Sequence, residues 1–225
     1  MKMGMGMPIP DLSNLPGVSR PGGGGTPGPP PLAQIDNLNS MSFDGASDFI
    51  TISNPTELTG DFTISAWILP TRVNNSYEMI YTQGTAIAGS ACLAPYLAIK
   101  DTRLHLCITG VYETGLNFIT ANEWQHVVAT RTSGVLNLYR NGVEYNGTRP
   151  TQNGTINANN QGRIGVWYNS THYFKGKIDE TAIWNTALTE AEILSIYNAT
   201  AVVDGVNKTA DLSQLTTPPI AWYRM

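Results

Sequence analysis

The chain has 225 residues, a net charge of −4 and a charged fraction of only 13%. This length suits one large all-β domain with an appendage, or two small domains. Because no run of like charges appears, electrostatic capture of nucleic acid or of an anionic membrane is disfavoured. No stretch approaches the ~20 apolar residues of a membrane-spanning helix, and the N-terminal residues lack the apolar segment of a secretory signal.

Residues 1–37 form an arm rich in Gly and Pro. Such a segment buries too few apolar side chains to fold alone, and proline lacks the N–H that a β-ladder requires, so we expect an extended conformation. The apolar residues at its start alternate with small or polar ones, which would lay one apolar edge into a groove between subunits. The arm is therefore predicted to fasten the protein to an assembly, through Met1, Met3, Met5, Met7, Ile9, Leu12 and Leu15.

From about Leu38 the pattern changes to short alternating runs separated by turn residues, which predicts an antiparallel β-sandwich. The expected strands are residues 49–53, 62–69, 96–100, 104–108, 124–131, 135–140, 143–145, 162–167 and 175–184. In the second of these, alternation places Thr63, Ser65 and Trp67 on the face opposite to Phe62, Ile64, Ala66 and Ile68. No alternation of strands with helices appears, so a parallel-sheet fold is excluded.

Two local signals are sharper than the rest. Asn141-Gly142 lies between two alternating runs, and both residues accept positive φ, so a type I′ hairpin is predicted there. Thr189 followed by Glu192 has the spacing of a capping box and predicts that a short helix begins at this point.

The two cysteines are interpreted as small buried hydrophobic residues. If residues 96–100 and 104–108 form a hairpin, Cys107 lies opposite Tyr96. Cys92 is then several residues out of register with Cys107, beyond the reach of a disulfide bond.

The ordered motifs of residues 38–200 resemble a laminin-G-like, concanavalin A-like jelly roll. The motifs that carry the resemblance are Met41-Ser42-Phe43-Asp44-Gly45, residues 62–68, Glu123-Trp124-Gln125-His126-Val127-Val128-Ala129-Thr130, residues 138–143 and Phe174-Lys175-Gly176-Lys177-Ile178-Asp179-Glu180. The resemblance implies a binding or structural module that recognises glycans or proteins, of a kind also found in phage and virus particles. A fold of this type hosts many functions and does not by itself assign one.

No catalytic motif accompanies the resemblance, so a non-enzymatic protein is predicted. Glycosidases pair two acidic residues across one site. Here Asp179 and Glu180 are adjacent on a strand and are expected to point to opposite faces, while Glu190 and Glu192 belong to the helix start. His126 lies on a half-buried strand, where a structural role is expected.

No cofactor is required by the sequence, although the resemblance implies that one structural calcium could be held at a rim. The candidate metal ligands are Asp44, in the turn after the first strand, and Asp179, in the last strand, because first and last strands are commonly neighbours. The alternative is that Asp44 forms an Asx turn and that Asp179 pairs with a lysine or with the backbone.

A sugar-binding face needs aromatic platforms with polar edges. The segment 167–173 supplies both, and its candidate sugar-binding residues are Trp167, Tyr168, His172 and Tyr173, which Tyr77 and Tyr81 could join. The alternative is that these aromatic residues cover an edge of the sandwich or dock a neighbouring subunit.

Residues 201–225 are set apart as a C-terminal extension, whose apolar end is expected to dock on a partner or to continue into further chain. Residues 40–199 are expected to fold on their own.

The sequence supports two alternative functions. The first is a virion protein, most simply of a phage, that joins other virion proteins in an oligomeric assembly through its arm. The alternative is a secreted or cell-surface module, extracellular in location, that binds glycans; neither function involves nucleic acid or a membrane.

Overall fold

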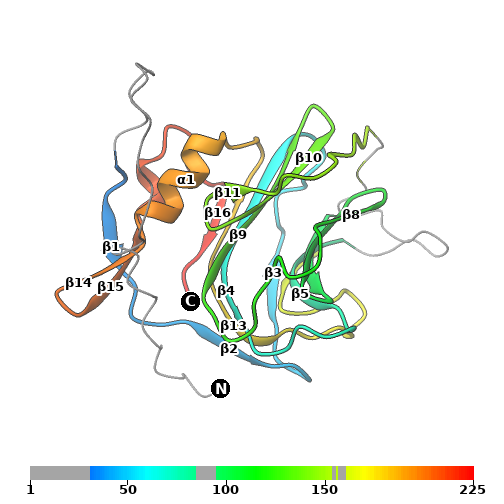
Figure 1. The fold of residues 1–225 in the computed structure, drawn as a ribbon, viewed down its shortest axis with the longest axis horizontal. Coiled ribbons are helices and arrows are strands. Elements are labelled where there is room, and N and C mark those ends of the chain that lie inside the picture. The colour runs from blue at the N-terminus through cyan, green and yellow to red at the C-terminus, as the bar shows by residue number, and fades with distance from the viewer. Residues whose placement is uncertain (1–30, 85–94, 154–155, 157–160) are drawn as a thin grey trace.

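A computed structural model describes residues 31–84, 95–153, 156 and 161–225. Two antiparallel sheets face each other as a jelly-roll sandwich, and a third, smaller layer lies beside one of them (Figure 1). The all-β fold class and the short helix near the C-terminus are therefore confirmed. The predicted partner-binding residues of the arm, from Met1 to Leu15, lie outside the described residues.

The first sheet has seven strands, and its longest member, β13, lies inside it. Its strands are β11 (Val143–Glu144), β10 (Val135–Arg140), β9 (Gln125–Thr132), β4 (Phe62–Pro70), β13 (Lys175–Trp184), β16 (Ala221–Tyr223) and β2 (Met41–Asp44). One edge of β13 pairs with β4, and its other edge is shared between β2 and β16. The expectation that the first and last strands of the domain are neighbours is met by the β2–β13 pair.

The second sheet has six strands and forms the opposite wall of the sandwich. In order across the sheet they are β3 (Ile50–Ser53), β12 (Gln161–Ile164), β5 (Glu78–Gln83), β6 (Tyr96–Lys100), β7 (Arg103–Cys107) and β8 (Val111–Glu113). The β6–β7 hairpin turns at Asp101 and Thr102, whose φ angles are +51° and +62°. In the first sheet, the β10–β11 hairpin turns at Asn141 and Gly142, with φ of +53° and +77°, which confirms the predicted type I′ geometry.

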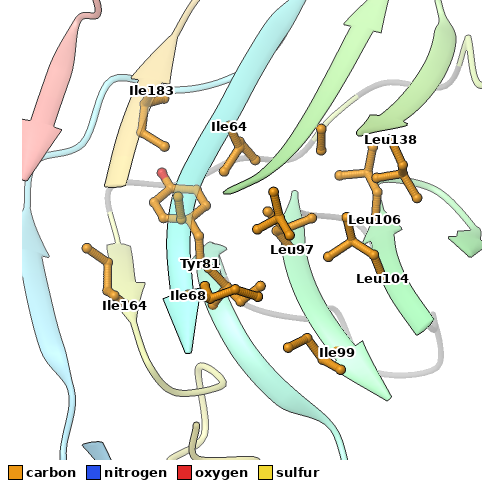
Figure 2. Close-up of a cluster of buried hydrophobic side chains, with 14 of the residues drawn as sticks. Ile64, Ile68, Tyr81, Leu97, Ile99, Leu104, Leu106, Leu138, Ile164 and Ile183 are labelled. Carbon is orange, nitrogen blue, oxygen red and sulfur yellow. The ribbon is translucent and has the colours of Figure 1, made fainter. Parts of the chain in front are cut away.

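The core lies between the two sheets and follows the predicted alternation. Phe62, Ile64, Ala66 and Ile68 of β4 are all fully buried in it. Leu97 and Ile99 of β6 and Leu104 and Leu106 of β7 meet them from the six-stranded sheet (Figure 2). Each such side chain contributes about 1.5–3 kcal/mol when it leaves water, so this interface is the main source of stability.

The outer face of the seven-stranded sheet is covered by a third layer. This layer consists of α1 (Glu190–Asn198), η2 (Leu212–Gln214) and a sheet of β1 (Gln34–Asp36), β15 (Val206–Ala210) and β14 (Ala201–Val203). The helix begins with the predicted capping box, in which Thr189 and Glu192 bond reciprocally. Because the layer excludes water, Thr63, Ser65 and Trp67 are buried as fully as the core face of the same strand.

The segment set apart as a C-terminal extension is paired with the sandwich. The strand β16 adds to β13 through Thr181, Ala182 and Ile183, and the indole N–H of Trp184 donates to the Thr217 carbonyl at 3.0 Å. The end of the predicted arm likewise pairs, since β1 bonds to β15. In the structure, residues 34–36 and 201–225 therefore pack as parts of the same body as residues 38–200.

Candidate functional site

A tight loop between β12 and β13 carries the predicted sugar-binding residues. The N–H of Trp167 donates to the Thr171 carbonyl and the N–H of Ser170 donates to the Trp167 carbonyl, both at 3.0 Å. Ser170 and His172 have positive φ, at +58° and +57°, which reverses the chain within a few residues. The loop backbone thus fixes the positions of its aromatic side chains.

Three of the four predicted residues are brought together in one group, which we call the aromatic patch: Tyr77, Tyr96, Trp167, Tyr168 and His172. The Tyr96 and Trp167 ring centroids are 4.8 Å apart at 87°, and those of Trp167 and Tyr168 are 5.1 Å apart. Tyr77 lies 6.3 Å from Tyr96 and 5.6 Å from His172, again edge to face. Each such contact contributes about 0.5–1.5 kcal/mol beyond area burial, so the rings support one another in fixed orientations.

The aromatic patch lies on the outer face of the six-stranded sheet, the wall labelled β3, β5 and β8 in Figure 1. Alternation along β6 sends Leu97 and Ile99 into the core and therefore directs Tyr96 outward. Tyr96 is 4% exposed and forms the floor, whereas Trp167 and Tyr168 are half-buried and His172 is exposed. The patch thus offers partly exposed rings on a buried aromatic base.

Polar groups border the aromatic patch. The ammonium of Lys100 lies 4.8 Å from the Tyr77 ring centroid. The exposed side chains of Asn169 and Thr171 bond to each other at 2.5 Å, and Arg163 donates to the Trp167 carbonyl at 3.3 Å. Aromatic platforms bordered by hydrogen-bonding groups are the arrangement that a sugar ring requires, since its faces are apolar and its rim carries hydroxyls.

Two histidines touch the Tyr77 ring, and burial lowers the pKa of both. His105 is 3% exposed and lies 5.5 Å from Tyr77; burial lowers its pKa more than the nearby Glu113 carboxylate raises it. Burial and the charge of Lys100 lower the pKa of His172. Both imidazoles are therefore mostly neutral at pH 7, and the positive charge beside the patch comes from Lys100 and Arg163.

The fourth predicted residue, Tyr173, lies apart from the patch and faces Phe49. The two ring centroids are 6.4 Å apart, and the Arg163 guanidinium lies 5.5 Å from the Phe49 ring. Phe49 is 40% exposed and borders a pocket of about 240 Å³. Phe49 was predicted to lie in a strand, without a functional role, and in the structure it directly precedes β3. Because Ile50 and Ile52 do not share a face with their neighbours in sequence and pack on the core, Phe49 faces outward, and this alternation is the signal that could have found it.

Tyr81 does not join the site. Its ring lies in the core among Ile68 and Ile164 (Figure 2), is 1% exposed, and has a pKa raised well above its usual value by burial. The cause is a β-bulge in β5 between Met79 and Tyr81, which interrupts the alternation.

The structure does not bring the two candidate calcium ligands together. The β2–β13 register pairs Asp44 with Lys175, four residues from Asp179, which is roughly 13 Å along a strand. Calcium ligands lie at about 2.3–2.6 Å from the ion, so these two carboxylates cannot share one. Among the described residues, no group of three or more His, Cys, Asp or Glu side chains is placed to hold a metal.

Asp44 instead organises the turn that follows β2. Its Oδ1 accepts the N–H groups of Ala46, Ser47 and Asp48 at 2.7, 2.8 and 3.1 Å. These bonds hold the pKa of the carboxyl well below its usual range. This is the Asx-turn alternative considered for Asp44.

The expectation that Asp179 and Glu180 point to opposite faces is wrong. Glu180 has a φ of +48°, and the β13–β4 register shifts between Asp179 and Ala182, so alternation is lost at this point. Both carboxylates are buried and both accept bonds from the terminal segments. Burial, and then the charge of Glu180, raise the pKa of Asp179 to about 7.

His126 has the structural position that its strand predicted. Its Nε2 lies 2.8 Å from Ser65 Oγ, its ring stacks on Trp67 at 5.3 Å, and it is fully buried. Burial lowers its pKa to about 3. The Nδ1 atom has no hydrogen-bond partner among the described residues, so no carboxylate orients this Ser–His pair as a catalytic triad requires.

The interpretation of Cys107 as an unlinked residue is wrong, because Cys107 is disulfide-bonded. Its predicted place opposite Tyr96 is correct. Cys92, the other cysteine of the sequence, lies outside the described residues. The register of the β6–β7 hairpin constrains only residues within the paired strands, and Cys92 precedes β6.

The family is shown by a match that runs from the turn after β2 to the helix α1. The model of the concanavalin A-like lectin/glucanases superfamily, Laminin_G_3, matches residues 44–194. The chain belongs to this superfamily. A search of curated proteins finds no match. No helix in the described parts of the chain has the length and apolar character needed to cross a membrane.

Solved structures share the fold of this superfamily member. A Bacteroides ovatus protein described as carbohydrate-binding has a TM-score of 0.61 and 18% identity over 87% of this chain and 52% of its own. Domain 4 of an extracellular arabinanase from Geobacillus stearothermophilus, solved with arabinotriose, has a TM-score of 0.55 and 22% identity over 76% and 81%. A pentraxin from Limulus polyphemus has a TM-score of 0.53 and 15% identity over 77% and 96%. The chain spans about half the length of the first of these proteins.

Proposed function

We propose that this superfamily member is a non-enzymatic glycan-binding module and that the aromatic patch is its binding surface. The observation that carries the proposal is the run of edge-to-face ring contacts from Tyr168 through Trp167 and Tyr96 to Tyr77, on the outer face of the six-stranded sheet. Aromatic rings held in this way offer apolar platforms without a large loss of side-chain entropy on binding.

Two structural relatives support the proposal, since one is described as carbohydrate-binding and another was solved with arabinotriose. The chemistry of the described residues favours binding over catalysis. The paired carboxylates Asp179 and Glu180 lie buried beneath the terminal segments, and the Ser65–His126 pair is buried as well.

The disulfide at Cys107 favours an extracellular location, because disulfides persist in oxidising compartments and are rare in reducing ones. The virion role was expected from the N-terminal arm, and that arm lies outside the described residues up to residue 30. None of the three structural relatives named above is described as a virion protein. The glycan-binding alternative therefore has the stronger support.

Screening the protein against a glycan array, followed by calorimetric titration with the best oligosaccharide, tests the proposal. Trp167→Ala and Tyr168→Ala should each weaken binding by about tenfold, because losing one aromatic contact costs roughly 1.4 kcal/mol. Tyr145→Ala is the matched control: its ring is also half-buried and contacts Phe118 at 5.4 Å, outside the patch. Equal affinities for all the variants would place the site elsewhere, and an array without any bound glycan would refute the function.

A further inference from the structure

Lys100 and Arg163 are the cations near the aromatic patch that have no acidic partner among the described residues. Arg163 donates to the Trp167 carbonyl and to Ser170 Oγ, whereas the Lys100 ammonium lies over the Tyr77 ring.

Lys100 is the last residue of β6, and alternation with the buried Ile99 directs its side chain to the outer face, where it lies over Tyr77. Arg103, its partner across the hairpin, is paired with Glu113. In the described part of the chain, no carboxylate lies within ion-pair distance of the Lys100 ammonium.

The sequence adds few acidic residues outside the described parts of the chain. Residues 85–94 and 157–160 contain no acidic residue, and Asp11 is the only one in residues 1–30. The protein as a whole has a net charge of −4. A cation without an acidic partner beside an aromatic platform therefore differs in sign from the net charge of the protein. An ammonium over a ring face is attracted by the ring quadrupole and is not neutralised by an opposite charge.

We propose that the aromatic patch selects sugars that carry a carboxylate, such as uronic or sialic acids. The sugar ring would lie on Trp167, and its carboxylate would accept a charge-assisted hydrogen bond from Lys100. The neutral amide of Asn169 and hydroxyl of Thr171 at the border suit the remaining hydroxyls.

The proposal rests on the proposed glycan-binding function and can be tested separately from it. Titrations would compare trigalacturonate with its fully methyl-esterified form, which has the same shape and no charge, and sialyllactose with lactose. The wild-type protein should bind the acidic member of at least one pair about tenfold more tightly, since a hydrogen bond to a charged group is worth roughly 1.5–3 kcal/mol. Which pair shows the difference identifies the uronate or the sialate as the source of the carboxylate.

Lys100→Met should remove the preference while binding of the neutral member persists. Lys208→Met is the matched control, because Lys208 lies on β15 in the layer beyond the other sheet and is paired with Asp36 there. If the wild type prefers neutral sugars, or if Lys100→Met retains the acidic preference, the proposal is overturned while the glycan-binding function stands. If no oligosaccharide binds to any of the proteins, both fail.

Discussion

The side-chain amide of Asn37 donates a hydrogen bond of 2.7 Å to Oδ2 of Asp179, across 142 residues of sequence. The other oxygen of the same carboxylate accepts the backbone N–H of Met225 at 3.1 Å. Glu180, next along the strand, accepts bonds from Thr209 and from the indole of Trp222. Two adjacent buried carboxylates therefore hold the N-terminal and C-terminal segments of the described chain against one strand, β13.

The first prediction concerns the pH dependence of stability. Burial and the neighbouring Glu180 raise the pKa of Asp179 to about 7, whereas an unfolded aspartate titrates near about 4. The folded state binds this proton more tightly, so its contribution to stability is complete below about pH 4 and is lost as the pH rises through about 7. The free energy of unfolding should decrease across this window by up to roughly 1.4 kcal/mol per pH unit.

Asp179→Asn should make that pH dependence shallower, because the amide cannot ionise; the part that remains belongs to Glu180, whose pKa burial also raises. Denaturant titrations at intervals between about pH 4 and pH 8 measure it. Asp204→Asn, at an exposed turn with φ of +51°, is the control and should retain the wild-type profile. A wild-type profile that rises with pH in this window would contradict the assigned direction.

The second prediction concerns the boundaries of the folding unit. The fragment 40–199, expected from the sequence to fold alone, lacks β1, β15 and β16 and would expose Trp184, Leu188 and Ile196. Exposing each buried side chain to water costs about 1.5–3 kcal/mol, so the summed cost approaches the total free energy of unfolding of a domain. We expect this fragment to aggregate or to bind a hydrophobic dye, and residues 31–225 to unfold cooperatively. Cooperative melting of both fragments at similar temperatures would contradict this expectation.

The third prediction concerns Gly176, where β13 passes closest to the end of β4. Its φ is +140°, and an added Cβ would lie 2.1 Å from the Leu69 carbonyl oxygen. Gly176→Ala should therefore lower the free energy of unfolding by more than about 3 kcal/mol, since both strain and backbone displacement are required. Gly60→Ala has nothing within 4 Å of the new Cβ and should have little effect in the same denaturation assay.

The fourth prediction concerns the disulfide at Cys107. Removing a native disulfide costs about 2–4 kcal/mol, so a reducing agent should lower the melting temperature of the wild type. Cys107→Ala should melt at the reduced wild-type temperature and be insensitive to the reducing agent. Indifference of the wild type to reduction would show that the bond contributes nothing to stability.

The features predicted correctly from the sequence are those set by neighbours in the chain. The core face of residues 62–68, the turn at Asn141 and the capping box at Thr189 each depend on a few consecutive residues. The burial of Ser65 and Trp67 depends instead on the third layer, whose residues Ile196, Thr209 and Leu212 lie about 130 positions later or more, and no local pattern encodes that. The same holds for Glu180, whose orientation follows from a bulge and not from alternation.

In the candidate site, too, the residues close in sequence were predicted and those brought in by distant strands were not. The density of aromatic residues in 167–173 located three members of the aromatic patch, because a rigid loop keeps neighbours in sequence near one another. Lys100 and Tyr96 join them only through strand pairing, and Tyr173 turns away toward Phe49. Pairwise geometry between strands, which a single sequence does not state, decided which residues share the site.

The third layer makes the two outer faces of the molecule different. Pro31 borders a groove with Asn198 of α1, and Met225 contacts β13, so both ends of the described chain lie on the side of the seven-stranded sheet (Figure 1). The aromatic patch lies on the outer wall of the other sheet. The two ends of the described chain and the aromatic patch therefore lie on opposite outer faces of the molecule, so a contact made at one of these faces leaves the other free.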